Sequence, residues 1–128
     1  MKEYKIQIEV CKFLYYLQDK YQFRFFHIPN EGKRSIQSRM ILNKMGLKSG
    51  CPDLCIEFSG GRIVYIELKT STGRLSNNQQ LWYENSVKLK TPHFVLKGDF
   101  DTIKNQIYEI VRRHGKFIET QPKSEVVK

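Results

Sequence analysis

The sequence predicts a single domain of the α/β class. Its 128 residues are enough for one hydrophobic core and too few for two. Segments with apolar residues at helical spacing alternate along the chain with short runs of β-forming residues. Two of these runs flank a glycine pair, which is typical of a β-hairpin. We expect the domain to cover residues 1–118, and residues 119–128, which lack periodicity, to form a flexible tail.

The first half of the chain predicts two helices with a strand between them. A helix over about residues 3–18 is indicated by apolar residues that recur at helical spacing: Ile6, Val10, Phe13, Leu14 and Leu17. Residues 23–28 form a β-rich run that stops at Pro29. A second helix, ended by Gly46, is predicted within residues 33–48, with its apolar face formed by Ile36, Met40, Ile41 and Met45.

The second half predicts the hairpin, two helices and a further strand. Residues 54–58 and 63–68 are the hairpin strands, and residues 94–96 can form another strand. A helix opens at Ser76 and continues to about Leu89, and a last helix begins near Asp101. Ser76 and Gln79 form the Ser-x-x-Gln pattern of a capping box, so capping alone can account for Gln79.

Asp53, Glu67 and Lys69 are the candidate catalytic residues. Mg²⁺ prefers oxygen ligands and usually takes one or two carboxylates from a protein, which Asp53 and Glu67 would supply. Lys69 lies two residues after Glu67 on an extended segment and therefore points to the same face. It could position an attacking water or offset charge on the transition state. Taken singly, Glu-x-Lys on a strand is usually a solvated ion pair and Pro-Asp is usually a turn.

The register of the hairpin tests this site. A strict two-residue loop at Gly60-Gly61 would pair Asp53 with Leu68 and turn Asp53 away from Glu67 and Lys69. A glycine bulge in the turn, or departure of Asp53 from the ladder after Pro52, would bring the carboxylates together. We predict such an irregularity, because a regular hairpin would exclude the metal site.

The charge of the chain favours a polyanionic partner. Lys and Arg number 22 against 13 Asp and Glu, which gives a formal charge of +9. No apolar run is long enough for a transmembrane helix and no signal peptide is apparent, so we expect a cytoplasmic protein that binds nucleic acid, and no membrane. Three cysteines without a Cys-x-x-Cys pair predict buried thiols, although a zinc site using Cys51, Cys55 and either His27 or His93 is conceivable.

Basic residues are concentrated in the sequence shortly before Pro52-Asp53. Residues 33–48 include five basic residues and no acidic one. Such a run is usually a solvated helix face, but its closeness to Pro52-Asp53 favours phosphate contact. The predicted DNA-binding residues are Lys33, Arg34, Arg39, Lys44, Lys48 and Arg74.

Three sequence segments resemble a known family when read in order. They are GLKSGCPDL at residues 46–54, IELK at 66–69 and GRLSNNQQLW at 73–82, preceded by GKRS at 32–35. This set is similar to the VRR-NUC branch of the PD-(D/E)xK nuclease superfamily, and the similarity covers nearly the whole chain. One departure is Cys51, where the family more often has a small aliphatic residue.

The resemblance implies a fold and a set of site residues. The implied fold is a restriction-endonuclease-like core, a central mixed β-sheet flanked by α-helices, with Mg²⁺ or Mn²⁺ at the strand ends. Asp53 and Glu67 would be metal ligands, Lys69 the catalytic lysine and Gln79 an additional site residue. A glutamate of the first helix is also expected; Glu3 fits best by its spacing to Gln7, with Glu9 as a rival.

The resemblance also implies a substrate. Family members that consist of this domain alone are similar to Holliday-junction resolvases and are often encoded by phages, so we expect a phage- or bacteria-encoded endonuclease. Cleavage of branched DNA by a homodimer, without an organic cofactor, is the leading hypothesis. The alternatives are a nicking or flap endonuclease of the same fold and a non-catalytic DNA-binding module.

Overall fold

The computed structural model describes residues 1–29 and 35–117. Within these ranges the helices and strands follow one another in this order: α1 (Glu3–Leu17), β1 (Tyr21–His27), α2 (Ile36–Lys44), β2 (Leu54–Phe58), β3 (Arg62–Lys69), α3 (Asn77–Lys88), β4 (His93–Lys97), α4 (Phe100–His114) and β5 (Lys116–Phe117). The predicted tail, residues 119–128, lies outside the described residues, and so do Lys33 and Arg34.

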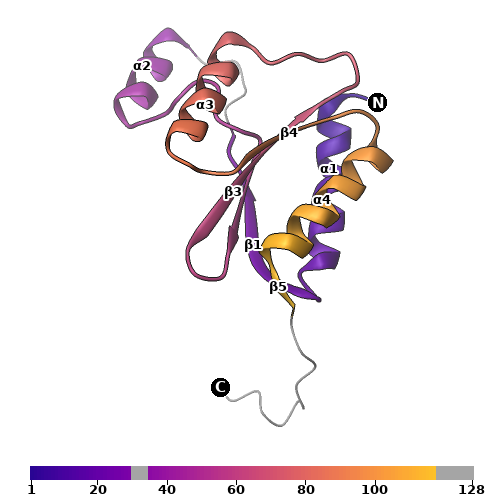
Figure 1. Ribbon diagram of the computed structural model, residues 1–128. Coiled ribbons are helices and arrows are strands. Elements are labelled where there is room, and N and C mark those ends of the chain that lie inside the picture. Colours follow the sequence, from indigo (N-terminus) through magenta and orange to yellow (C-terminus); the bar gives the residue numbers. More distant parts are fainter. Residues whose placement is uncertain (30–34, 118–128) are drawn as a thin grey trace.

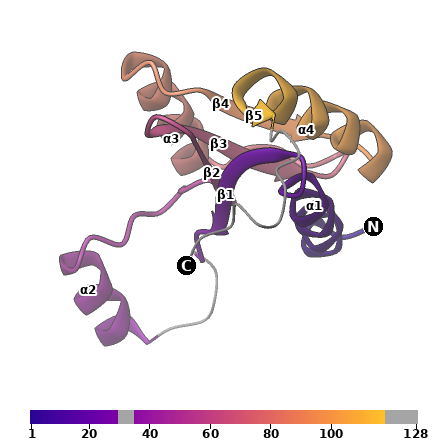
Figure 2. The ribbon, with the colours of Figure 1, turned by 90° about the horizontal axis from the view of Figure 1, so that it is seen from below.

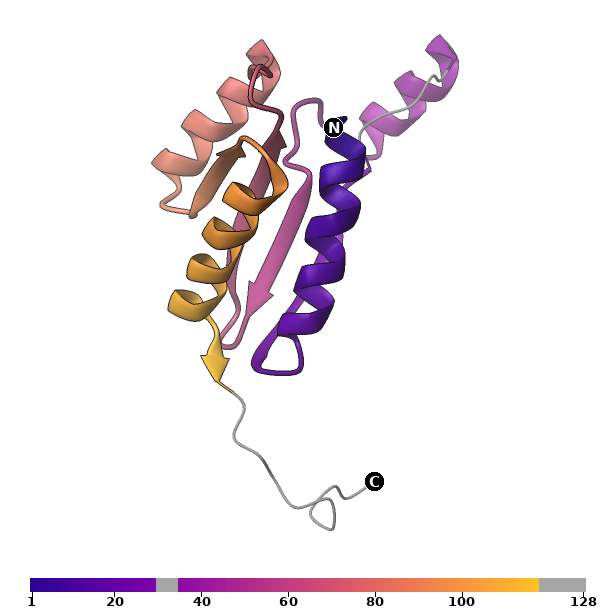
Figure 3. The ribbon, with the colours of Figure 1, turned by 90° about the vertical axis from the view of Figure 1, so that its right-hand side faces the viewer.

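The strands form one mixed sheet with the order β4-β3-β2-β1-β5. β3 and β4 are parallel, whereas the β1–β2, β2–β3 and β1–β5 pairs are antiparallel. Helices α1 and α4 lie side by side on one face (Figures 1 and 3). α3 packs on the opposite face, where Trp82 contacts Tyr65 and Tyr83 contacts His93. The α/β class and the restriction-endonuclease-like sheet flanked by helices are confirmed.

The core lies between the sheet and the α1–α4 layer. α1 buries Ile6, Val10, Leu14 and Leu17, and α4 buries Ile103, Ile107, Ile110 and Val111. These apolar rows recur every three or four residues, which is the period that places them on one helical face. They cover alternate residues of the central strands, including Leu54, Ile56, Val64, Ile66 and Leu68. The remaining residues of β3 therefore point to the other face of the sheet.

The β2–β3 hairpin has the irregularity that the sequence predicted. Phe58 pairs with Arg62, so the loop has three residues instead of two. Gly60 and Gly61 both have positive φ, at 86° and 76°, a conformation that glycine adopts without the steric penalty of a side chain. Ser59 is consequently outside the ladder, and the register of every following residue shifts by one.

The predicted second helix is present as α2, and β5 is an additional element. α2 begins at Ile36, where Ser35 caps it by accepting a hydrogen bond from the Ser38 N–H, and it buries no residue. All four residues of its expected apolar face are more than half exposed, because α2 stands apart from the other helices (Figure 2). β5 has only two residues and was not predicted, since its pairing with Tyr21 and Gln22 depends on where α4 ends. No described helix is long and apolar enough to cross a membrane.

Candidate active site

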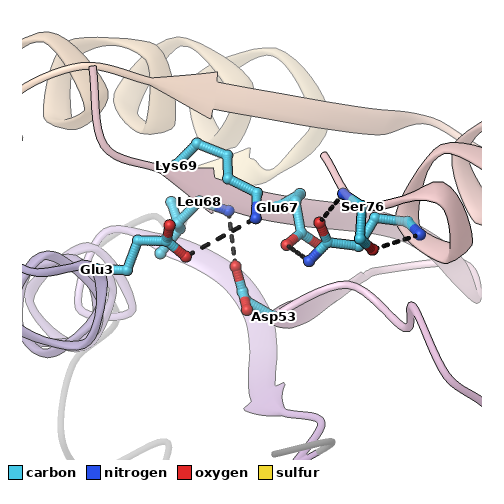
Figure 4. A network of polar contacts seen from close by, with 7 residues as sticks. Glu3, Asp53, Glu67, Leu68, Lys69 and Ser76 are labelled. Carbon is cyan, nitrogen blue, oxygen red and sulfur yellow. Dashed lines mark hydrogen bonds and ion pairs between the residues drawn. The ribbon is translucent and has the colours of Figure 1, made fainter. Parts of the chain in front are cut away.

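The candidate residues converge from four segments of the chain. Asp53 immediately precedes β2, and Glu67 and Lys69 lie at the end of β3. Gln79 is in the first turn of α3, and Glu3 begins α1. Figure 4 shows Glu3, Asp53, Glu67 and Lys69 around one point at the end of β3. The strand end therefore gathers side chains that are far apart in the sequence.

The shifted register places Asp53 beside Glu67. Leu54 pairs with Ile66, so continuing the antiparallel register by one residue sets Asp53 opposite Glu67. Residues directly opposite each other project their side chains to the same face. Asp53 Oδ2 also accepts a hydrogen bond of 2.7 Å from the Leu68 N–H, which holds the carboxylate at the strand end. Asp53 and Glu67 therefore lie on the same face of the sheet, as a shared metal site requires.

Gly50 allows the loop before Asp53 to approach helix α3. Gly50 has a φ of +85°, and a Cβ at this position would lie 2.4 Å from the carbonyl carbon and oxygen of Asn78. No larger residue fits without moving the backbone of α3. The Asn78 side chain donates to Ser49 Oγ at 2.9 Å and fastens the same contact. Gly50 thereby sets the distance between the Asp53 loop and the first turn of α3.

Glu67 is a buried carboxyl group with one oxygen satisfied. The residue is 1% exposed, and its Oε1 accepts a hydrogen bond of 2.9 Å from Gln79 Nε2. Oε2 is buried and has no hydrogen-bond partner in the described part of the chain. Burial, followed by the nearby Asp53 carboxylate, raises the pKa of Glu67 to about 8, against the opposing effect of Lys69. A buried acidic group with an open oxygen is chemically suited to hold a cation.

Gln79 is both a capping residue and a neighbour of the acidic pair. Its Oε1 accepts from the Ser76 N–H at 2.8 Å, and its own N–H donates to Ser76 Oγ at 3.2 Å. Because the amide oxygen is engaged with a backbone donor, the amide nitrogen must face Glu67. The capping box thus orients the side chain that binds Glu67 Oε1 and leaves Oε2 open.

Lys69 connects the acidic pair to Glu3. The Lys69 side chain is only 10% exposed, and its Nζ lies 4.0 Å from Glu3 Oε1. Glu9, the rival candidate, instead pairs with Lys12 at 3.3 Å on the surface of α1. The structure therefore brings Glu3 to the site and leaves Glu9 away from it.

Comparison with known proteins identifies the family of this arrangement. The VRR-NUC domain model matches residues 3–100, which include all five candidate residues. The chain belongs to the VRR-NUC domain family. Family membership indicates a nuclease that acts on DNA.

Solved VRR-NUC structures have the same fold. One, described as a VRR_NUC domain protein, has a TM-score of 0.67 and 22% sequence identity, with 88% of this chain and 89% of that chain covered. A second, described as a VRR_NUC domain, has a TM-score of 0.57 and 20% identity, with coverage of 83% and 94%. A search of curated proteins found no match.

Four of the six predicted DNA-binding residues are within the described ranges of this VRR-NUC domain, and these four lie on its surface. Arg39 and Lys44 are on α2, Lys48 follows it, and Arg74 is in the loop between β3 and α3. All four side chains are exposed and form no ion pair with another described residue. They are therefore available to a ligand, but only Arg74 belongs to the loop that joins Lys69 to Gln79.

The alternative zinc site is absent from the described residues. No group of three or more His, Cys, Asp or Glu side chains there is arranged to hold a metal ion. Burial raises the pKa of both Cys51 and Cys55, which disfavours the thiolate form that a zinc site needs. The Asp53–Glu67 pair remains as the candidate metal centre of the VRR-NUC domain, with two protein ligands as is usual for Mg²⁺.

His27 is a neighbour of the site that sequence reasoning missed. Its Nδ1 lies 2.7 Å from the Asp53 carbonyl oxygen and 2.9 Å from the Gln7 side-chain amide. Nδ1 donates to the Asp53 carbonyl in the tautomer that carries its proton there, and it accepts from Gln7 Nε2 in the other tautomer. His27 thereby joins α1 to the Asp53 loop. A signal for it was present in its position at the end of a strand, but a single histidine does not indicate its partner.

Proposed function

We propose that this protein is a metal-dependent DNA endonuclease that hydrolyses phosphodiester bonds in branched DNA. The observation that carries the proposal is the open, buried Oε2 of Glu67 beside Asp53. A carboxylate pair of this kind is costly to bury unless a cation balances it. Family membership supports the nuclease activity, and the carboxylate pair supports its dependence on metal.

Asp53 and Glu67 would hold Mg²⁺ or Mn²⁺. Both are oxygen ligands, which these cations prefer, and two carboxylates leave positions for water and a substrate phosphate. The ion, when bound, would act as a Lewis acid toward the phosphodiester. Gln79 would keep Glu67 in the ligating orientation, because its hydrogen bond engages Oε1 and leaves Oε2 to the cation.

Lys69 would act on the reacting groups. Its ammonium group lies on the same face as Glu67 and is held near Glu3. From there it can orient a water for attack and offset the negative charge that develops on the phosphate. Glu3 would fix the position of the ammonium group, because the carboxylate approaches Lys69 from α1.

DNA would reach this site along the basic surface. Arg74 lies in the loop between Lys69 and Gln79, while Arg39, Lys44 and Lys48 would hold the duplex arms at a distance through their phosphates. Contacts to phosphates do not read sequence, so selectivity for DNA shape is the expected form of recognition. A homodimer would present two such sites to a symmetric junction.

Cleavage assays on DNA of different shapes test this proposal. Labelled four-way junction, flap and linear duplex are incubated with Mg²⁺, Mn²⁺ or EDTA, using wild type, Lys69→Ala and Lys97→Ala. Lys97 is the exposed neighbour of Lys69 on β4 and controls for loss of a positive charge. We expect metal-dependent junction cleavage that Lys69→Ala lowers by about 10²-fold or more and Lys97→Ala retains.

Other outcomes separate the alternatives. Cleavage of flap or nicked duplex in preference to the junction would keep the chemistry and replace the substrate. Salt-sensitive DNA binding without cleavage of any substrate by folded wild type would contradict the nuclease and favour the non-catalytic DNA-binding module.

A further inference from the structure

Helix α3 and strand β3 border a cavity that the proposed chemistry does not use. Its volume is about 410 Å³, within the range of about 300–1,000 Å³ that is typical of small-molecule sites. Tyr65 of β3 forms one wall, and Trp82, Asn85 and Lys88 of α3 line another part. Leu89, at the end of α3, completes this side. The cavity therefore combines two aromatic rings with an amide and an ammonium group.

The cavity lies next to the candidate active site on the same elements. Tyr65 precedes Glu67 by two residues on β3, so both side chains point to one face of the sheet. Trp82 follows Gln79 by three residues and lies one turn along the same side of α3. Two strand residues span about 7 Å, which is roughly the rise of two stacked nucleotides. A DNA strand with a phosphate at Glu67 can therefore bring a neighbouring nucleotide to the cavity.

The two aromatic rings have a geometry that suits a flat ligand. The ring centroids of Tyr65 and Trp82 are 6.2 Å apart, and the ring planes are at 77°. A planar ligand stacked on one ring consequently meets the other edge-on, and both arrangements are favourable. Tyr65 also packs edge-on against His93, and the buried Ser86 Oγ donates to the Trp82 carbonyl at 3.0 Å. These contacts hold the rings in place before a ligand binds, which lowers the cost of ordering them.

The polar groups of the cavity favour a nucleotide over an apolar ligand. Asn85 and Lys88 are exposed, and their side chains have no hydrogen bond or ion pair to another described residue. A side-chain amide both donates and accepts, as recognition of a base edge requires, and an ammonium group suits a phosphate. A lipid or an apolar peptide would leave both groups unused. A nucleotide would use the rings, the amide and the ammonium group together.

We propose that this cavity binds the base of an unpaired nucleotide close to the scissile phosphate, with the base against Trp82 and Tyr65 and its edge toward Asn85. A paired base is held inside the duplex, whereas an unpaired base leaves the stack at lower cost. The cavity would thus select DNA that has unpaired bases near the cleavage site. The inference rests on the proposed function for the place of the scissile phosphate, and it gives selectivity for branched DNA a physical source.

Trp82 fluorescence tests the proposal directly, because Trp82 is the only tryptophan of the sequence. Short oligothymidylate and an abasic strand of the same length are titrated into wild type in EDTA, without cleavage. The two strands carry the same phosphates and differ only in their bases. We expect saturable quenching by oligothymidylate, because a stacked base quenches an indole and adds affinity. The abasic strand should bind at least about tenfold more weakly.

Leu89→Glu and Val87→Glu form a matched pair of variants. Both positions are exposed, at 76% and 61%, but only Leu89 lines the cavity. At physiological salt, Leu89→Glu should weaken oligothymidylate binding about tenfold, and Val87→Glu should stay within about twofold of wild type. Asn85→Ala should weaken binding about threefold or more, since a contact with the base edge is lost. Circular dichroism checks folding, and the comparison of strands needs wild type alone.

The outcomes distinguish this cavity from the proposed nuclease activity. Equal affinity for both strands, no quenching in folded wild type, or equal losses in Leu89→Glu and Val87→Glu would overturn the base-binding role. Base-dependent quenching in a protein that cleaves no DNA would support the cavity and contradict the proposed function alone. Cleavage of branched DNA by a protein without base-dependent quenching would contradict the cavity alone.

Discussion

The candidate active site and helix α2 differ in how much of their structure this chain determines by itself. Glu67 and Lys69 are 1% and 8% exposed, and hydrogen bonds hold Glu67, Gln79 and Asp53 in place. α2 has no buried residue and exposes apolar and basic side chains alike. Packing within the domain therefore sets the geometry of the site, whereas no buried residue fixes α2 in the described part of the chain, which leaves its exposed face to a ligand or partner.

We expect the largest effect for Glu67→Gln, which should lower cleavage without lowering the stability of the fold. Glu67→Gln keeps the shape of the side chain but removes the charge that would hold a cation, so cleavage should fall by about 10²-fold or more. Without metal, Glu67→Gln should be at least as stable as wild type, because burial disfavours the charged carboxylate of Glu67. Cleavage rates and thermal unfolding in EDTA measure the two effects. Unfolding of the variant at lower temperature would contradict the account.

The pair Gly50→Ala and Gly46→Ala tests the contact between the Asp53 loop and α3. Both glycines have positive φ, at +85° and +102°, but a Cβ at Gly46 meets no atom within 4 Å. Gly46→Ala should therefore lower the free energy of unfolding only by the strain of an alanine at positive φ, about 1 kcal/mol. Gly50→Ala should cost about 1–3 kcal/mol more and lower cleavage about tenfold, because α3 and Gln79 must move. Equal unfolding free energies for the two variants would exclude this role of Gly50.

The pair Gln79→Ala and Ser76→Ala separates capping from orientation of Glu67. Each variant loses part of the capping box and should lose about 1 kcal/mol of unfolding free energy, measured by urea denaturation. Gln79→Ala should also lower cleavage about 10- to 100-fold, since the partner of Glu67 Oε1 is removed. Ser76→Ala should be close to wild type in cleavage; a similar loss in both variants would mean that α3 is displaced as a whole.

The smallest effects on the folded protein are expected at α2. Arg39→Gln and Lys44→Gln should leave thermal stability unchanged, because neither side chain is buried. The logarithm of the DNA-binding constant falls linearly with the logarithm of salt concentration. Each variant should make this slope shallower by about one, as expected for loss of one phosphate contact. Fluorescence anisotropy at several salt concentrations measures the slope. An unchanged slope in both variants would remove α2 from the DNA-binding surface.

Local patterns were sufficient for most elements of the fold. The apolar rows of α1 and α4 and the Ser76 capping box depend on residues within one or two turns, so they can be read along the chain. The hairpin irregularity was predictable because a metal site with Asp53 and Glu67 on opposite faces is impossible. Which irregularity occurs depends on Gly60 and Gly61 both taking positive φ, and sequence alone does not choose among the glycine turns.

Contacts between distant segments were not predictable. The choice of Glu3 over Glu9 near Lys69 follows from where α1 begins relative to the end of β3. The hydrogen bonds of His27, the approach of Gly50 to Asn78 and the short β5 pairing depend likewise on the packed domain. The exposure of the apolar face of α2 could not be predicted either, because an apolar helix face does not show which element, if any, covers it.

Direct measurement of metal binding tests whether Asp53 and Glu67 form a metal centre. Isothermal titration of Mn²⁺ into wild type, Asp53→Asn and Lys97→Ala requires neither DNA nor turnover. We predict one stoichiometric site in wild type and in Lys97→Ala, with affinity lowered about tenfold or more in folded Asp53→Asn, because a carboxylate ligand is lost. Equal Mn²⁺ affinity in wild type and Asp53→Asn, or no binding by folded wild type, would contradict a metal centre at Asp53 and Glu67.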